Sequence, residues 1–184
     1  LAIELAAARV NLLTPRDMLD QFDRRFQWLT DGARDSHTWR QTLRGALAWS
    51  YNLLDKEERA LLQRLSIFAG GWTLSAAEAV CSKDAFPLLL QLANKSLVVS
   101  EPEHGRYHML ETMREFALEK LAAGKEEASL RARCLAFFAD WAEDLESKLD
   151  ALPLNESRRL VDAERNNLHA ALNWALENKS ARAD

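Results

Sequence analysis

The residues best suited to chemistry gather in one short stretch, RYHMLETMREFA, which spans residues 106–117. It places His108 three residues before Glu111, at what the pattern indicates is the start of a helix. An imidazole can hydrogen-bond a phosphate oxygen, and the free amides at a helix N-terminus favour anions. The stretch is therefore either a phosphate-sensing site or only the end of a β-hairpin.

Glu111 has a second explanation that needs no ligand. A carboxylate in the first turn of a helix interacts with the free amides and the positive end of the helix dipole, which stabilises the helix by about 0.3–1 kcal/mol. Capping alone would account for a glutamate at this position.

Other catalytic or nucleotide-binding patterns are missing from the sequence. There is no G-x-x-x-x-G-K-[ST] loop to hold phosphates, and no apolar run ends in acidic residues that could hold Mg²⁺. The four histidines are scattered and have no evident catalytic companion: His37, His104, His108 and His169. We therefore expect this chain not to be an enzyme, and to bind no cofactor and no metal by itself.

The hydropathy pattern and the cysteine content predict a cytoplasmic protein without a membrane segment. No apolar run reaches the length of about 18 residues that a bilayer requires, and no signal peptide is visible. Cys81 and Cys134 lie in apolar helical patterns with no partner at metal-ligand spacing, which indicates buried free thiols in a reducing compartment.

The elements that must position RYHMLETMREFA are mostly helical. Apolar residues recur at helical spacing over six segments: 1–13, 16–25, 39–55, 56–69, 75–81 and 86–94. The polar stretch LTDGARDSHT separates the second segment from the third. Three boundary signals are visible: Thr14-Pro15 as a helix start, Gly70-Gly71 as a helix end, and Ser75 as an N-cap with Glu78 as its capping-box partner.

The period then changes from helix to strand. Val98 and Val99 are β-branched, Pro102 and Gly105 are turn residues, and a second short extended run follows. Helices, a hairpin and one further helix from Glu111 make a winged-helix arrangement, in which the hairpin is the wing. The predicted fold class is therefore mainly α, with a winged-helix domain that includes a two-stranded hairpin.

Beyond Gly124 the sequence is helical again. One amphipathic helix stops before Pro153, and a second covers VDAERNNLHAALNWALEN. Two such helices could begin an α-helical repeat array, although one pair does not establish a period.

A DNA-reading winged helix needs polar and basic side chains on its third helix and on its wing. Here that helix, FPLLLQLANKS, has Lys95 as its only cation. The wing has a mixed and partly acidic tip, formed by Glu101, Glu103, His104 and Arg106. The net charge of −4 also gives no footprint of a nucleic-acid binder. We expect this domain not to bind DNA.

The remaining charged and aromatic residues suggest structural roles. Four arginines share helical segments with Glu57 and Glu58, and their default environment is solvent: Arg40, Arg44, Arg59 and Arg64. Tryptophans recur at helical spacing with apolar neighbours, which favours core positions over a ligand cage: Trp39, Trp49, Trp141 and Trp174 among them.

Five segments in order carry a resemblance to a known class: LAIELAAARV, QTLRGALAWSYNLLDKEERALLQRLSIFAGGWTLSAAEAVC, LANKSLVV, YHMLETMREFALEKL and ERNNLHAALNWALE. Together they resemble the signal-transduction ATPases of the STAND class. The likeness is strongest to LuxR- and AfsR-like bacterial transcriptional regulators that carry an NB-ARC-type nucleotide switch.

The resemblance implies a domain order and a set of partners. Residues 1–36 would end a small helical (ARC1-like) domain, 37–124 would form the winged helix, and 125–184 would start a TPR-like sensor arm. The family's Gly-x-Pro signature would end just before Leu1, so we expect the chain to be a piece of a longer parent. In that parent, an upstream P-loop domain of the same chain would bind ATP or ADP with Mg²⁺. The arm would meet an unknown ligand or protein, and DNA would be bound through another domain.

The resemblance also assigns the site. Many members of the class carry a Met-His-Asp motif at the foot of the last strand, where the histidine reaches the β-phosphate of ADP. Met109-Leu110-Glu111 occupies that place, so Leu110 replaces the histidine. His108 lies two residues earlier, which displaces it by about 7 Å along an extended strand. Met109, Glu111 and His108 are thus the residues expected to face nucleotide in the parent, while a half-exposed wing histidine is the competing reading of His108.

The function that this implies is a non-catalytic relay between a nucleotide switch and a sensor arm, in a protein that controls transcription. A winged-helix DNA-binding transcription factor with a helical dimerisation or ligand arm is the alternative.

Overall fold

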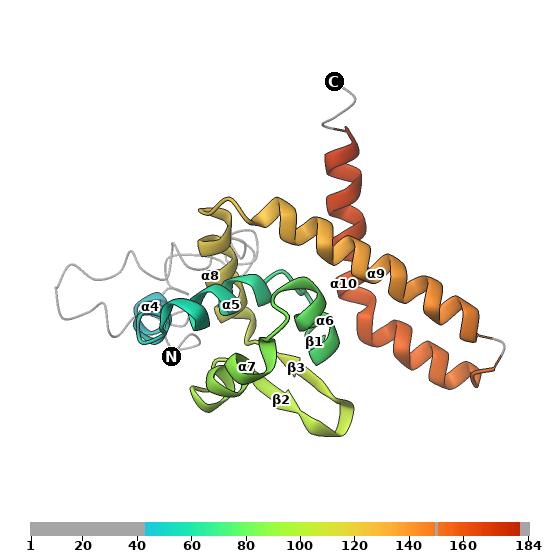
Figure 1. Ribbon diagram of the computed structural model, residues 1–184, viewed down its shortest axis with the longest axis horizontal. Helices are drawn as coiled ribbons and strands as arrows, with labels where there is room; N and C mark the ends of the chain where they lie inside the picture. The colour runs from blue at the N-terminus through green and yellow to red at the C-terminus, as the bar shows by residue number, and fades with distance from the viewer. Residues whose placement is uncertain (1–42, 150, 181–184) are drawn as a thin grey trace, which may run out of the picture. The chain divides into compact units, whose positions relative to one another are not determined.

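The structure is a computed structural model that describes residues 43–149 and 151–180 (Figure 1). The predicted helices over 1–13 and 16–25, the Thr14-Pro15 helix start and the polar stretch LTDGARDSHT lie outside the described residues. The chain divides into two compact units, one ending at Asp55 and one starting at Lys56.

The described part of the first unit is helix α4, Leu43–Asn52. Leu47, Tyr51 and Leu54 are buried, as their spacing predicts. The expectation that Trp49 shares this apolar face is wrong, because its side chain is 54% exposed. Trp49 lies two residues from both Leu47 and Tyr51, and two residues on a helix are about 200° apart, so it points to the opposite side.

The second unit contains the winged helix. Its helices are α5 (Lys56–Leu65), α6 (Leu74–Val80), α7 (Ala85–Asn94) and α8 (Glu111–Ala122). Its strands are β1 (Trp72–Thr73), β2 (Val99–Glu101) and β3 (Arg106–His108). They form an antiparallel sheet of order β1-β3-β2, in which Trp72 pairs with Tyr107 and Val99 pairs with His108.

The wing is the predicted hairpin of β2 and β3, which projects away from the helices in Figure 1. A single 3₁₀ turn over Pro102–His104 and a left-handed Gly105, at φ 62°, join the two strands, so both predicted turn residues take that role. Strand β1 is not among the predicted elements. Two residues are too short to show a period of two, and β1 exists because β3 offers it a partner.

Helix α5 ends earlier than predicted. The sequence indicates a helix to residue 69 that is closed by Gly70-Gly71, whereas α5 stops at Leu65. The amides of Ser66, Ile67 and Phe68 bond to carbonyls three residues back, and the Ser66 hydroxyl bonds to the carbonyl of Gln63. These bonds tighten the last turn and end the α-helix before the glycines.

The predicted N-cap of α6 is also wrong. The helix begins at Leu74, and the cap is Thr73, whose hydroxyl accepts a hydrogen bond from the Ala76 amide at 3.2 Å. An N-cap residue needs an extended backbone. Thr73 has one, at φ −91° and ψ 163°, because it ends strand β1, whereas Ser75 already lies within the helix.

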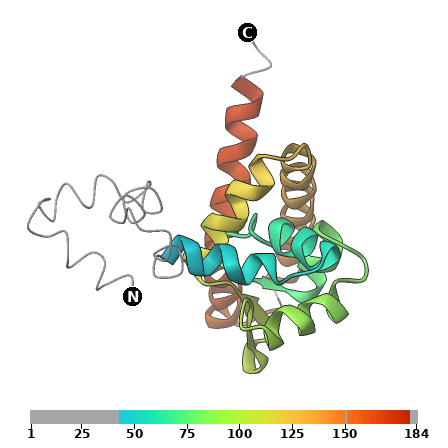
Figure 2. The ribbon, with the colours of Figure 1, turned by 90° about the vertical axis from the view of Figure 1, so that its left-hand side faces the viewer.

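The arm is a pair of helices, α9 (Glu127–Lys148) and α10 (Leu154–Ser180), that pack side by side (Figures 1 and 2). As predicted, α9 ends before Pro153. The structure therefore confirms a mainly helical chain with a winged helix and a helical C-terminal segment. A TPR-like continuation stays a prediction.

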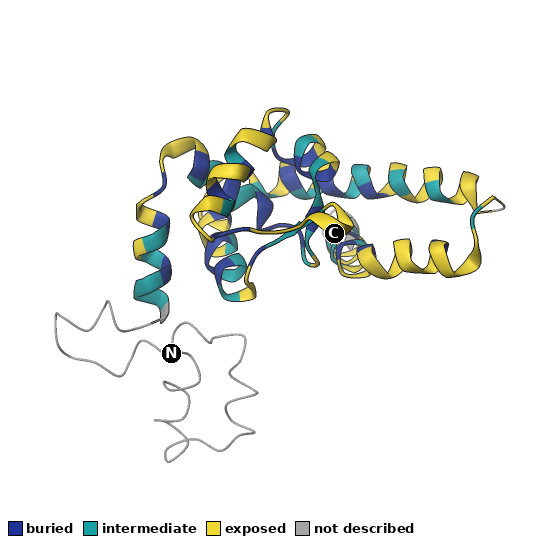
Figure 3. Ribbon diagram, turned by 90° about the horizontal axis from the view of Figure 1, so that it is seen from below, coloured by how far each residue is buried: buried dark blue, intermediate teal, exposed yellow. Residues whose placement is uncertain are grey.

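One core joins the winged helix to the arm. The Phe68 ring stacks on Trp72, at 5.8 Å between centroids, and meets Phe138 of α9 edge to face at 6.4 Å. The largest fully buried side chains are Trp72, Phe68, Phe138, Leu61, Leu62, Leu65, Leu89, Leu92, Leu130, Glu58, Val80 and Val98. By contrast, the first half of α10 is mostly exposed (Figure 3).

Among the helices of the described residues, none is long and apolar enough to cross a bilayer.

Candidate functional site

The predicted site divides at the end of strand β3. His108 is half exposed, and its Nδ1 lies 3.2 Å from Oε1 of Glu101 on the neighbouring strand β2. Met109 follows with its side chain buried in the core, 7% exposed. His108 therefore belongs to the hairpin, and Met109 anchors the strand end. The placement agrees with the reading of His108 as a half-exposed wing histidine.

The next two residues open helix α8. Leu110 is its N-cap residue, with a side chain 61% exposed, and its carbonyl accepts the amides of Met113 and Arg114. Glu111 lies in the first turn, as the capping explanation requires. Both of its carboxylate oxygens accept hydrogen bonds from Arg114, at 3.0 and 2.7 Å. Arg114 also donates to the carbonyl of Ser66 at 3.1 Å, which ties α8 to the end of α5.

The four positions thus face different surroundings. His108 is paired with Glu101, Met109 is in the core, Leu110 points outward, and Glu111 is paired with Arg114. Leu110 supplies neither a charge nor a proton at the position where the class that this chain resembles has its histidine. Their role toward nucleotide in a longer parent stays a prediction.

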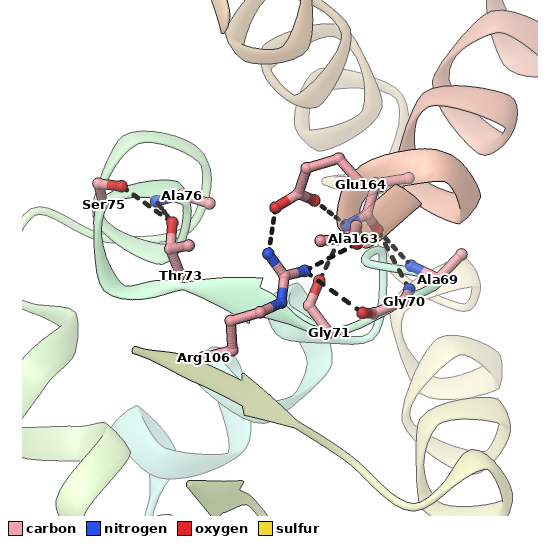
Figure 4. Close-up of polar contacts among 10 residues, drawn as sticks. Ala69, Gly70, Gly71, Thr73, Ser75, Ala76, Arg106, Ala163 and Glu164 are labelled. Atoms are coloured by element: carbon pink, nitrogen blue, oxygen red, sulfur yellow. Dashed lines mark hydrogen bonds and ion pairs between the residues drawn. The ribbon is translucent and has the colours of Figure 1, made fainter. Parts of the chain in front are cut away.

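A second polar cluster, which we call the wing–arm junction, consists of Arg106, Glu164 and Asn167 and their backbone partners at residues 69–71 and 163 (Figure 4). Asn167 of α10 is 1% exposed, and its amide is fully used. Oδ1 accepts the amides of Ala69 and Gly70 at 2.8 and 3.2 Å. Nδ2 donates to the carbonyl of Gly71 at 2.9 Å and to Oε2 of Glu164 at 2.7 Å.

Glu164 carries the connection on to the wing. Its Oε1 accepts a hydrogen bond from Nη1 of Arg106, the first residue of β3, and both side chains are mostly buried, at 9% and 15% exposed. Nη2 of Arg106 also donates to the carbonyl of Ala163 at 3.2 Å and to that of Gly70 at 3.4 Å. An ion pair held this way, with its remaining groups hydrogen-bonded, resists separation of its parts.

The sequence reasoning placed Arg106 in the wing, and it did not single out Glu164 or Asn167 as a site. One signal was present. Both lie in ERNNLHAALNWALE, three residues apart, on the helix face that continues through Leu168 and Ala171. Two polar residues in line with an apolar face indicate a buried polar contact.

On the helix that would read DNA in a DNA-binding winged helix, the nearby cation Lys95 pairs with a carboxylate of the same domain. Lys95 follows α7, and its Nζ lies 2.5 and 2.7 Å from the two carboxylate oxygens of Glu58. The Glu58 carboxylate is buried, with its side chain 2% exposed. On α7 itself the exposed side chains are uncharged: Phe86, Pro87, Leu90, Gln91 and Asn94.

Arg64 is also not simply solvated. It forms two 3.0 Å hydrogen bonds to Glu126 and a third to the carbonyl of Cys81. The hydrogen bond from Arg64 lowers the pKa of Glu126, and the same bond raises the pKa of Arg64. This pair links α5 to the residue that precedes α9, and it is a second polar contact between the winged helix and the arm.

Comparison with known proteins adds a family to this geometry. Residues 54–122 match a family described as "Winged helix-turn-helix domain". The chain contains a winged helix-turn-helix domain. The matched region begins two residues before α5, ends at the last residue of α8 and includes the whole wing.

Curated relatives extend the likeness past this domain. The "Putative HTH-type transcriptional regulator Rv0890c" of Mycobacterium tuberculosis strain H37Rv is 40% identical over 97% of this chain, and the match covers 21% of that protein. The "Uncharacterized protein Rv0894" of the same strain is 39% identical over 72% of this chain and 36% of its own length. The chain thus spans about a fifth of the length of the regulators that it matches, and it is homologous to them. No solved structure matches it significantly.

Gly71, in the loop between α5 and β1, allows a prediction about the stability of the winged helix-turn-helix domain. Gly71 has φ +78°, and a Cβ there would lie 2.7 Å from the carbonyl oxygen of Tyr107. Gly71→Ala is expected to lower the free energy of unfolding by about 2 kcal/mol, measured by urea denaturation. Gly105→Ala is the control. Its φ is +62° with nothing within 4 Å, so it should cost about 1 kcal/mol, and equal losses would refute the contact with Tyr107.

The two thiols give a chemical prediction. Both cysteines are free and buried, as expected, and burial raises the pKa of Cys81 and of Cys134 to about 12. Because only the thiolate reacts, neither should react with Ellman's reagent at pH 8 in the folded protein, and both should react in denaturant. Rapid reaction of either thiol without denaturant would contradict the burial.

Proposed function

We propose that this chain is the non-catalytic relay of a nucleotide-switched transcriptional regulator of the STAND class, which passes a conformational signal between the winged helix-turn-helix domain and a helical sensor arm. The wing–arm junction is the observation that carries the proposal. It fixes strand β3 and residues 69–71 to helix α10 through partly buried hydrogen bonds. A movement of α10 would therefore act on the wing, which is what a relay between two states requires.

The electrostatics of the third helix support a relay over direct DNA reading. Each phosphate contact needs an available cation. The cation beside α7, Lys95, neutralises the buried carboxylate of Glu58. The exposed residues of α7 itself carry no charge, and they include Phe86 and Leu90 as well as the polar Gln91 and Asn94. Such a face suits contact with protein better than contact with a phosphate backbone.

Nucleotide enters the proposal through the parent and not through this chain. ATP or ADP with Mg²⁺ would be held by the upstream domain, and the stretch from His108 to Glu111 would face it. Leu110 is 61% exposed, which would allow it to contact that domain. We expect calorimetry of the isolated chain with ADP to show no specific heat of binding. Micromolar affinity would mean that the chain holds a nucleotide site of its own.

Amide hydrogen exchange tests the relay. Glu164→Gln keeps the size of the side chain and removes the charge that holds Arg106. Exchange should accelerate about tenfold at residues 69–73 and 106–108, because local opening becomes easier, with little change in α5. Glu177→Gln, an exposed position on the same helix, is the matched control. If Glu164→Gln alters exchange only within α10, the junction does not couple the arm to the wing.

A DNA-binding transcription factor is the second candidate, and the winged helix-turn-helix match and the names of the relatives favour it. An anisotropy titration of the chain with duplex DNA over a range of salt concentrations separates the two. The relay predicts no binding below micromolar concentrations at physiological salt. Sub-micromolar binding that weakens steeply with salt would establish the alternative.

A further inference from the structure

A cleft of about 600 Å³ lies between the winged helix and the arm. Thr73, His104 and Arg106 form its winged-helix side. Trp141 of α9 and the first turns of α10, including Arg159 and Leu160, form its arm side. The volume is typical of pockets that take small organic molecules, and the cleft borders the wing–arm junction at Arg106 and Glu164.

Of the two arginines that line the cleft, one is available to a ligand. Arg106 and Glu164 neutralise each other. Glu156 lies in the first turn of α10, where the helix dipole favours a carboxylate. Arg159 is exposed, and within residues 43–149 and 151–180 its guanidinium has no hydrogen-bond or ion-pair partner. The cleft therefore offers an open guanidinium, the group best suited to pair with a carboxylate through two parallel hydrogen bonds.

The apolar part of the cleft lies beside that cation. Leu160, the residue after Arg159, is 41% exposed, and Trp141 is only half buried although it is a large aromatic residue. The sequence reading placed Trp141 in the core, and the structure places it in the wall of this cleft instead. An indole face next to a leucine suits a flat apolar ligand.

We propose that the cleft binds a small planar aromatic carboxylate, whose carboxylate pairs with Arg159 and whose ring lies against Trp141 and Leu160. A ligand in this position contacts both the winged-helix side and the arm. It would stabilise their present arrangement by the difference between its binding free energies for that arrangement and for an open one. In this respect the inference rests on the proposed relay, for which the ligand would be the arm's signal.

The binding test uses three probes with the same ring system: 2-naphthoate, 2-naphthalenemethanol and 2-naphthylmethylammonium. The indole N–H resonance of Trp141 in the intact chain, assigned by its loss in Trp141→Phe, reports on the cleft. We expect saturable binding of naphthoate, about tenfold tighter than the neutral alcohol and tighter still than the cation, because a charge-assisted pair adds that much affinity.

Two charge variants decide the assignment. Arg159→Gln should reduce the affinity for naphthoate to that for the alcohol, and Glu156→Gln should increase it, because a repelling carboxylate is lost. Both residues are exposed, so both variants should fold, which circular dichroism checks. Absence of saturable binding, equal affinity for all three probes or preference for the cation would overturn the proposal. If naphthoate binds but Glu164→Gln alters hydrogen exchange only within α10, the binding site stands and the proposed relay does not.

Discussion

Replacing Asn167 with alanine is expected to lower the free energy of unfolding of this chain by about 3–4 kcal/mol. The change removes four hydrogen bonds at once from a side chain that is 1% exposed. It leaves the Ala69 amide and the Gly71 carbonyl without these partners and removes one partner from Glu164. Each buried polar group left unsatisfied costs about 1–3 kcal/mol, and a small cavity adds to that sum.

The measurement is urea unfolding followed by far-ultraviolet circular dichroism, with Asn173→Ala as the matched control. Asn173 is an exposed asparagine on the same helix, so its loss should change the free energy of unfolding by less than about 0.5 kcal/mol. Equal effects of the two substitutions would show that the amide of Asn167 does not hold the arm to the winged helix.

The winged helix was predictable because its signals are local. Apolar spacing along α5 and α7, the β-branched pair before the wing, and the turn residues Pro102 and Gly105 each depend on a few neighbouring residues. The third strand, β1, could not be predicted from such signals. Its two residues become a strand only because Tyr107 and Arg106 lie opposite them, more than thirty positions away in the chain.

The buried polar residues show where sequence reasoning failed. Charged residues on helices are usually exposed, and no local pattern marks Glu58 as an exception. It is buried because α7 covers it and brings Lys95 within hydrogen-bonding distance, and no property of KEERALLQRL reveals that partner. Asn167 is similar, since its partners are backbone groups of a loop almost a hundred residues earlier.

The candidate site was predicted in part. The sequence places His108 at the end of a strand and Glu111 in the first turn of a helix, and the structure has both there. The sequence does not predict that Arg114 forms an ion pair with Glu111, or that the contact between wing and arm depends on Arg106 and Glu164. Pairings between side chains depend on how elements pack, and packing is the step that a periodic pattern leaves open.

The pair of Lys95 and Glu58 connects stability to function. A lysine beside the third helix of a winged helix-turn-helix domain would be a natural phosphate contact. Here its ammonium lies against both oxygens of a carboxylate that is itself shielded from water. If Lys95 turned to DNA, Glu58 would remain as a buried charge without this partner, so DNA binding by this route would cost folding free energy.

Lys95→Met is therefore expected to destabilise the chain by about 2–3 kcal/mol, although lysine-to-methionine changes on a surface are usually near neutral. The value is below that for a fully buried pair because the Lys95 side chain is 42% exposed. Urea unfolding measures the loss, and Lys83→Met, at an exposed lysine just before α7, is the control.

The double variant Glu58→Met, Lys95→Met separates a buried ion pair from simple loss of packing. Removing both charges removes the carboxylate that Lys95→Met leaves buried without its ammonium, so the double variant should be more stable than Lys95→Met alone. If it is less stable by the sum of the two single effects, the carboxylate and the ammonium do not act as a pair. In that case Lys95 would be available for other contacts, and the electrostatic argument against DNA binding would lose its main support.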